Sequence, residues 1–337
     1  MPHLSTRVLQ ALLTLLLTLF GLLLVTFALS AFSPVDRVLQ IVGDHASQST
    51  YDQVRHQLGL DRPLPVQFWH YLQNLAHGDL GTASATGQPV LQDLLHAFPA
   101  TLELATLALI IGTILGVIAG VLCARYAGSP LDLAIRTLTL LGNSVPIFWL
   151  GLLMLALFYA KLQWSAGPGR LDDIWQFTVE PRTGFALIDT WLSGDREAFR
   201  NAISHLVLPV VLLAYYSLAS ITRLTRSACL SEMNKEYILL ARAKGAGEMA
   251  ILLRHVLPNI RSTLLTVIAL AYTSMLEGAV LTETVFSWPG IGRYLTTALF
   301  AGDTTAIMGG TLLIGVCFVL INNLTDLLVR ATDPRVR

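Results

Sequence analysis

The stretch EYILLARAKGAGEMAILLRHVLPN, residues Glu236 to Asn259, decides how this chain is interpreted. It is rich in residues that favour helix, and it lies between two apolar segments that are each long enough to cross a bilayer. We expect it to fold into short helices that are broken at Gly245 and stopped at Pro258. Its basic residues place it on the cytoplasmic side of a membrane, where it can dock on a soluble partner.

The composition of the whole chain is that of a membrane protein. Mean hydropathy is +0.62, 54% of the residues are apolar and only 13% are charged, whereas about a quarter of the residues in a soluble domain are charged. Six segments without charge, one of them interrupted by Glu277, have the length of a spanning helix. They are Val8–Val35, Leu104–Ala124, Thr137–Ala160, Asn201–Thr222, Ser262–Thr282 and Thr304–Thr325. We therefore predict an all-α membrane protein with six transmembrane helices.

The distribution of Lys and Arg predicts the orientation. Of the 22 basic residues, 13 lie in segments on the side of the N-terminus and nine on the other side, whose segments are about twice as long. We expect both termini in the cytoplasm, with the chain in a bacterial inner membrane. The predicted parts are a first helix with an external segment (1–100), a core of five helices (101–330) with the loop at about 228–261, and a cytoplasmic tail (331–337).

The opening stretch resembles the coupling loop of ATP-binding-cassette importer permeases, because Ala241, Gly245, Leu257 and Pro258 have that family's spacing. Glu236-Tyr237 before Ala-Arg-Ala-Lys-Gly is similar to the dipeptide and oligopeptide branch, and the sequence also resembles Sap-type peptide permeases. ETVFSWPGIGRYL, which begins at Glu283, is a second family match. The resemblance covers nearly the whole chain. It implies a type I importer permease (MetI-like) fold with a cytoplasmic coupling-helix loop.

The resemblance also implies roles for particular residues. The loop would contact the ATPase, with a short helix in a groove of that subunit and with Gly245 where a side chain would clash. An external turn would form around Trp288, which can anchor at the membrane interface. The residues assigned to the ATPase-coupling loop are Glu236, Tyr237, Ala241, Arg242, Ala243, Lys244, Gly245, His255, Leu257, Pro258 and Asn259. Those of the external turn are Trp288, Pro289, Gly290 and Gly292.

Carboxylates near or inside the predicted spans are the remaining candidates. Glu277 lies inside a span, where a carboxylate is costly, so it either lines the translocation pathway or pairs with a neighbouring helix; both interpretations stay open. Glu103 and Glu283 lie near the outer ends of spans, where we expect water to reach them. Asp326 and Arg330 have the spacing of a local ion pair.

No catalytic or metal site is predicted. The chain has no phosphate-binding G-x-x-x-x-G-K-[ST] motif, so we expect a non-catalytic subunit without cofactors, whose partners use ATP and magnesium. Five histidines between residues 45 and 96 match no metal-ligand spacing. The three cysteines, Cys123, Cys229 and Cys317, are expected to be packing residues. No basic stripe indicates nucleic-acid binding.

The resemblance implies a second permease subunit in a heterodimer, two ATP-binding subunits and a periplasmic or external substrate-binding protein. The expected cargo is a di- or oligopeptide, with antimicrobial peptides, glutathione or nickel complexes as alternatives. An ion-driven secondary transporter would show inverted repeats and discontinuous helices. An intramembrane enzyme would need paired ionisable groups at one depth. Neither pattern is evident in the sequence.

Overall fold

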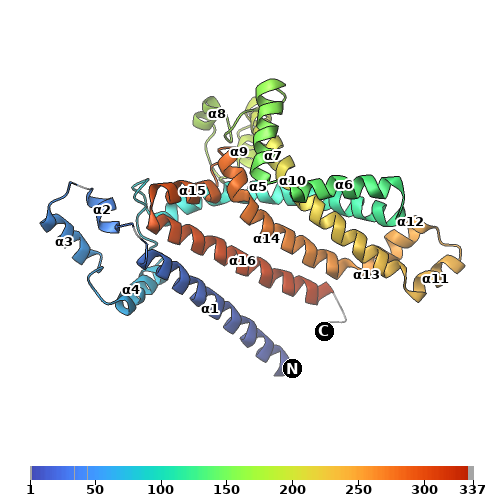
Figure 1. Ribbon diagram of the computed structural model, residues 1–337, viewed down its shortest axis with the longest axis horizontal. Helices are drawn as coiled ribbons and strands as arrows, with labels where there is room; N and C mark the ends of the chain where they lie inside the picture. Colours follow the sequence, from blue (N-terminus) through green and yellow to red (C-terminus); the bar gives the residue numbers. More distant parts are fainter. Residues whose placement is uncertain (1, 34, 44, 333–337) are drawn as a thin grey trace. The chain divides into compact units, whose positions relative to one another are not determined.

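The computed structural model describes residues 2–33, 35–43 and 45–332 (Figure 1). Within these residues the chain is helical and has no strand, apart from an isolated bridge between Thr82 and Pro89. The predicted all-α class is confirmed. The chain forms two compact units, which are described separately: Met1–Phe98 with Gly290–Leu320, and Pro99–Pro289 with Ile321–Arg337.

The first unit combines the N-terminal helices with a later part of the chain. Its elements are α1 (Pro2–Ala31), α2 (Arg37–Val42), α3 (Gln48–Gln57), α4 (Leu64–Ala76), the start of α5 (Val90–Arg125), α15 (Ile291–Ala301) and most of α16 (Thr304–Thr332). Helix α4 packs on α1 through Phe68, whose ring centroid lies 5.9 Å from that of Phe20 and 5.1 Å from that of Phe27. Trp69 lies in the same amphipathic helix, α4.

A buried carboxylate organises the far side of this unit. Asp303 is fully buried, and its Oδ1 accepts the Ala306 N–H at 3.0 Å in the first turn of α16. Its other oxygen accepts the N–H groups of Ser84 and Ala85. One side chain thus caps a helix and holds the loop before α5, so its charge is compensated by three backbone donors.

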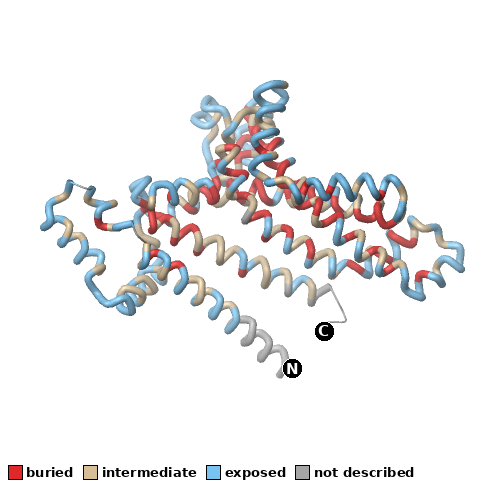
Figure 2. Tube along the Cα trace, in the orientation of Figure 1, coloured by how far each residue is buried: buried red, intermediate tan, exposed pale blue. Residues whose placement is uncertain are grey.

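The second unit contains the remaining helices. They are the rest of α5, α6 (Pro130–Ser144), α7 (Ile147–Met154), the π-helix η1 (Leu155–Lys161), α8 (Asp173–Thr178), α9 (Ala186–Leu192), α10 (Arg196–Met233), α11 (Glu236–Ala243), α12 (Glu248–Ile251), the π-helix η2 (Leu252–Val256), α13 (Leu257–Asn259), α14 (Arg261–Val285) and the end of α16. Buried residues concentrate along α5 and α10 (Figure 2).

Close packing of α5 against α10 depends on a stripe of glycines at every fourth position. A Cβ atom on Gly112 would lie 1.9 Å from the Ser217 hydroxyl, and one on Gly120 would lie 2.6 Å from the Thr225 Cβ. Gly116, between them, faces Ile221. Small residues at this spacing let two membrane helices approach closely. The three glycines of α5 therefore allow its backbone to lie against the side chains of α10.

The number of predicted spans agrees with the structure. Within the described residues, four helices are long and apolar enough to cross a membrane, and up to six are if each of two bent pairs counts as one span. One pair bends by 98° between α6, which ends at Ser144, and α7, which Pro146 directly precedes. A proline inside the charge-free segment Thr137–Ala160 predicts a bend in that span, and the structure has the bend at Pro146.

The second bend corrects an expectation. We predicted that the helical path stops at Pro258, but Pro258 lies in the first turn of α13, where proline is tolerated because its missing N–H has no intrahelical acceptor. The chain turns two residues later, at Ile260, and α14 follows at 70°.

Candidate functional site

The coupling loop, defined here as Glu236–Asn259, is anchored in the second unit by its apolar side chains. Ile238 of α11 and Ile251 of α12 are fully buried, as are Leu252 and Val256 of η2. They form one cluster with Val121, Ala124, Cys229 and Ile260. The loop therefore packs against the adjoining ends of α5 and α10, and a displacement of those helices is transmitted to it through close contacts.

Gly245 ends α11 in the left-handed conformation, with φ +83°. Its N–H donates to the Arg242 carbonyl at 2.9 Å, and the next N–H, of Ala246, donates to the Ala241 carbonyl at 3.1 Å. This pair of bonds is the Schellman motif, which satisfies carbonyls at a helix end and favours glycine. The predicted break at Gly245 is present. Its cause within this chain is the backbone angle and not a clash, because a Cβ there would meet open space.

A hydrogen-bond network ties both ends of the loop to α10. The Tyr237 hydroxyl donates to Glu232 Oε1 at 2.6 Å, and Asn259 Nδ2 donates to the Tyr237 hydroxyl at 3.2 Å. Asn259 also donates to the His255 carbonyl at 2.7 Å. Lys235 Nζ lies 2.7 Å from Glu232 Oε2, which balances the charge of this buried carboxylate.

The turn at Gly245 is closed by an ion pair between the two helices that flank it. Arg242 Nε donates to Glu248 Oε1 at 2.7 Å and its Nη2 to Glu248 Oε2 at 3.1 Å. The two-pronged geometry fits a guanidinium to a carboxylate, and the Glu248 carboxylate raises the pKa of Arg242 above its usual value. This pair holds α11 and α12 at one angle.

The opposite face of the loop is apolar and exposed. Leu239 is 58% exposed, Leu240 57%, and Leu253 54%, and Met249 is also exposed. Lys244, Arg254 and His255 are exposed as well. Figure 2 shows pale blue over much of α11 at this end of the unit. A loop with one face fixed in a core and the other presenting leucines beside basic residues has the character of a protein-binding surface.

A second polar centre links α5 to the segment between η1 and α10. Glu103 is 5% exposed and accepts the N–H groups of Ala186 and Leu187 at 3.2 and 2.8 Å, which caps α9 from another helix. Arg170 pairs with the same carboxylate and donates to the Gly184 carbonyl at 2.7 Å. Our expectation that water reaches Glu103 is wrong, because an arginine and two backbone donors compensate its burial.

The turn after α14 corrects two further expectations. Trp288 is fully buried, although we expected it at the membrane interface: its Nε1–H donates to the Ala100 carbonyl at 2.9 Å, and the Arg170 guanidinium lies 5.5 Å from its ring centroid. Glu283 is also fully buried and accepts from the Thr101 hydroxyl at 2.7 Å. The turn itself lies at Phe286 and Ser287, before Trp288 and Pro289; Gly290 is the N-cap of α15, and Gly292 lies in the first turn of that helix.

Some predicted residues lie outside what the structure describes. Glu277 falls within α14, but its side chain is not among the described ones, and the same holds for Asp326 and Arg330 in α16. Of the coupling-loop residues, Tyr237, Arg242 and Asn259 make the contacts given above. Glu236, Ala243 and Pro258 are exposed, and Leu257 is half-buried.

Sequence reasoning missed three residues that hold this unit together: Glu232, Asp132 and Arg226. Asp132 is 1% exposed, and its two oxygens accept from Nε and Nη2 of Arg226, both at 2.8 Å, which joins α6 to α10. The partners are 94 residues apart, so no local pattern links them. The one local signal is Ser129-Pro130, which is typical of a helix start. It places Asp132 in the first turn of α6, where the helix N-terminus favours an acidic residue.

Comparison with known proteins identifies the family. Residues 112–337 match the family model described as "Binding-protein-dependent transport system inner membrane component", and residues 2–105 match the model of its N-terminal region. The chain is 44% identical to the probable D,D-dipeptide transport system permease protein DdpB of Escherichia coli K12, over 96% of this chain and 94% of that protein. It is 41% identical to the di/tripeptide transport system permease protein DppB of Pseudomonas aeruginosa, over 95% of each.

Similarity to a solved structure agrees on the fold. A chain of the MetNI methionine ABC transporter, in an inward-facing conformation, superposes with a TM-score of 0.55 at 18% identity; the match covers 72% of this chain and 97% of that one. The predicted importer-permease fold is thus confirmed. With the family match extending over more than half of its length, this chain belongs to the inner-membrane components of binding-protein-dependent transport systems.

Proposed function

We propose that this chain forms half of the membrane pathway of an ATP-driven importer for dipeptides and short oligopeptides. In this proposal the chain does not hydrolyse ATP. Two separate subunits bind ATP with magnesium, and their closure pushes on the coupling loop. A second permease subunit of similar fold completes the pathway, and a substrate-binding protein delivers the peptide from outside.

The proposed contact with the ATPase rests on the coupling loop, which has one buried and one exposed apolar face. Its buried face contacts the ends of α5 and α10, and its exposed face presents Leu239, Leu240 and Leu253. A load applied to the exposed face therefore reaches two long membrane helices without passing through a flexible link. The Arg242–Glu248 pair and the Tyr237 network keep the loop stiff enough to transmit that load.

The proposal that the cargo is a peptide rests on the similarity of this chain to peptide permeases. DdpB and DppB are named as permeases for D,D-dipeptides and for di- and tripeptides, and each aligns with this chain over nearly the whole length of both. No contact in the described residues favours antimicrobial peptides, glutathione or nickel instead. Glu277, inside α14, is the side chain that we propose to meet the amino group of a peptide in transit.

The docking surface for the substrate-binding protein is proposed on the outer segments. The segment between η1 and α10 exposes large apolar side chains, among them Phe177, Trp191 and Trp164, which are 87%, 68% and 73% exposed. Such side chains are frequent at the centres of protein interfaces. The orientation proposed with it places both termini and the coupling loop in the cytoplasm, in line with the distribution of Lys and Arg.

The proposal as a whole is tested by recovery of the tagged chain from its native membrane in mild detergent, with its companions identified by mass spectrometry. We expect a second permease and one or two proteins with Walker motifs. Recovery of the chain alone, under conditions that keep related complexes intact, would refute the importer assignment and favour an ATP-independent carrier.

The loop is tested by Leu240→Asp, which puts a charge into the exposed apolar face. Replacing a side chain at the centre of an interface commonly costs about 2 kcal/mol of binding free energy, or roughly thirtyfold in affinity. The ATPase should therefore no longer co-purify with this variant. Ser231→Asp is the matched control, because it adds the same charge at the exposed end of α10 and leaves the leucines intact. Equal ATPase recovery with both variants would contradict the proposed docking face.

A further inference from the structure

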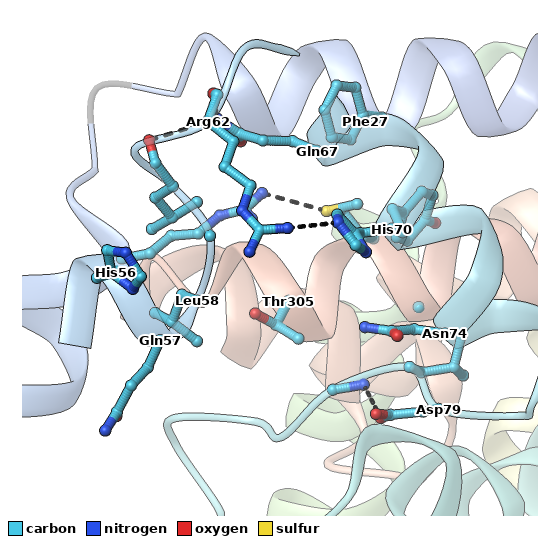
Figure 3. A pocket seen from close by; sticks show the side chains of 18 residues that line it. Phe27, His56, Gln57, Leu58, Arg62, Gln67, His70, Asn74, Asp79 and Thr305 are labelled. Carbon is cyan, nitrogen blue, oxygen red and sulfur yellow. Dashed lines mark hydrogen bonds between the residues drawn. The ribbon is translucent and has the colours of Figure 1, made fainter. Parts of the chain in front are cut away.

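A cavity of about 410 Å³ lies inside the first unit, and the transport proposal gives it no role. It is lined by parts of α1, α2, α4 and α16, by the end of α3 and by the loops after α3 and α4 (Figure 3). Its polar lining includes two donor-only cations, Arg37 and Arg62, beside amide and hydroxyl groups such as those of Asn74 and Tyr71, which can donate as well as accept. The lining therefore has more cations than acids, which favours an anion as the ligand of the cavity.

Arg37 is the clearest sign of a missing acceptor. Its Nη2 lies 3.4 Å from the sulfur of Met308, a weak acceptor, and no carboxylate of the described residues lies within ion-pair distance. Burial lowers the pKa of Arg37 below its ordinary value, although the guanidinium remains charged. A half-buried guanidinium with no described carboxylate beside it favours a ligand that supplies an anion.

Arg62 brings a second cation to the same space. Its Nη1 lies 2.7 Å from Nε2 of His70, and because arginine can only donate, that imidazole nitrogen is the acceptor. Figure 3 shows Arg62 reaching toward His70, with Thr305 and Asn74 below the pair. The contact holds the guanidinium over the cavity and still leaves other N–H donors for a ligand.

The remaining polar groups agree with an anion site. The buried Tyr71 hydroxyl is close to Thr26 but makes no hydrogen bond with the described residues. Asp79 is the one acid among the lining residues described, and its Oδ1 already accepts the Gly81 N–H at 2.8 Å. Two arginines against one aspartate leave the cavity positive at neutral pH.

The position of the cavity indicates the source of the anion. Phe27 is four residues before the end of α1, and Thr305 is the second residue of α16, so these two lie within about 6 Å of the helix ends at 1.5 Å per residue. Both helices are long and apolar enough to span a membrane. The ends of spanning helices lie at the level of lipid headgroups, where phosphate is abundant.

We propose that this cavity binds the phosphate of an anionic phospholipid, held by the guanidinium groups of Arg37 and Arg62. Guanidinium matches phosphate oxygens with paired N–H donors. The apolar part of the lining, which includes Phe27, Leu80 and Met308, faces the glycerol and the first acyl carbons. The bound lipid joins α1, α4 and α16 and fixes the external segment against the helices of its own unit.

The test is native mass spectrometry of the full-length chain in detergent, titrated with phosphatidylglycerol and, separately, with phosphatidylcholine. We expect retention of phosphatidylglycerol and about tenfold weaker binding with Arg37→Gln or Arg62→Gln, since each loses a charge-assisted contact. Arg55→Gln is the matched control, because Arg55 is exposed on α3 and does not line the cavity. Because Arg62 is exposed, its replacement should leave the fold intact, so weaker binding by Arg62→Gln reports on the lipid contact and not on misfolding.

Equal affinity of the wild type and both variants for phosphatidylglycerol would overturn the proposal. Equal retention of phosphatidylcholine would overturn the requirement for an anionic headgroup. Inorganic phosphate supplies the third arm: if it binds the wild type but phosphatidylglycerol does not, the site accepts a free anion and the lipid assignment is wrong. Displacement of the lipid by millimolar phosphate, with loss of both in Arg37→Gln, would support the phosphate as the recognised group.

Discussion

Replacing Gly245 by residues that differ in size and in backbone preference tests what this glycine does. Its φ of +83° is a conformation that side chains with a Cβ atom rarely adopt, and the space around it is open. If the backbone angle is the cause, Gly245→Asn should be tolerated better than Gly245→Ala, although asparagine is larger, because asparagine enters the left-handed region more readily. A bulky Gly245→Trp should combine this strain with obstruction of the partner.

The magnitude follows from the left-handed penalty of about 1–2 kcal/mol for a residue with a Cβ atom. The strain acts on the hydrogen bonds that close α11, from Gly245 to Arg242 and from Ala246 to Ala241. Destabilising these bonds by that amount raises the open population of the turn by roughly 5–30-fold. Gly247→Ala is the matched control in the same loop, because Gly247 has φ −68° and also has open space around it.

Hydrogen–deuterium exchange of the Gly245 and Ala246 amides measures the opening, and co-purification of the ATPase with peptide uptake measures the consequence. We expect faster exchange and reduced uptake for Ala, a smaller change for Asn and almost none for Gly247→Ala. The reasoning is refuted if Asn and Ala are impaired in order of their volume, because the constraint would then be the partner's surface. Normal transport by Gly245→Trp would refute the assignment of the coupling loop itself.

Two further predictions concern the outer parts of each unit. Glu103→Gln leaves the guanidinium of Arg170 buried without its carboxylate, so the free energy of unfolding in detergent should fall by about 3 kcal/mol. The control, Glu180→Gln, removes one partner of an exposed ion pair and should change that free energy by less than about 1 kcal/mol. Equal losses in the two variants would contradict the role of burial. The hydrogen bond from Tyr51 holds the pKa of Asp36 below 3.8, so its stabilisation of α2 should persist as pH falls to that value and disappear only below it. Hydrogen exchange at the start of α2 measures this, and Asp36→Asn should show no such transition; an unchanged transition in that variant would assign it to another group.

The large-scale fold was predictable because local properties determine it. Charge-free segments of sufficient length indicated the spans, and Pro146 indicated the bend between α6 and α7. Gly245 could be assigned to a helix end because a single residue type satisfies the left-handed angle there. Pro258 misled, since proline fits the first turn of a helix as well as it ends one.

The polar centres were not predictable, because their partners are remote in sequence. The sequence around Glu103 predicts a water-exposed carboxylate, because its partner Arg170 lies 67 residues later in the chain. Trp288 has the pattern of an interface anchor, but its indole N–H finds the Ala100 carbonyl, 188 residues away, inside the helix bundle. The identity of a buried polar residue's partner depends on tertiary packing, which composition and periodicity do not encode.

Helix α10 runs for 38 residues, from the cap at Asp195 to the start of the coupling loop, with Pro209 inside it. At 1.5 Å per residue it is about 57 Å long, almost twice the roughly 30 Å thickness of the hydrocarbon layer. Even at a tilt of about 40° a helix of that length is longer than the hydrocarbon layer, so a spanning helix of this kind extends beyond the layer. A tilt of only 10° about its midpoint displaces each end by about 5 Å, so a small rotation of the helix moves its two ends by similar distances, apart from any bend taken up at Pro209.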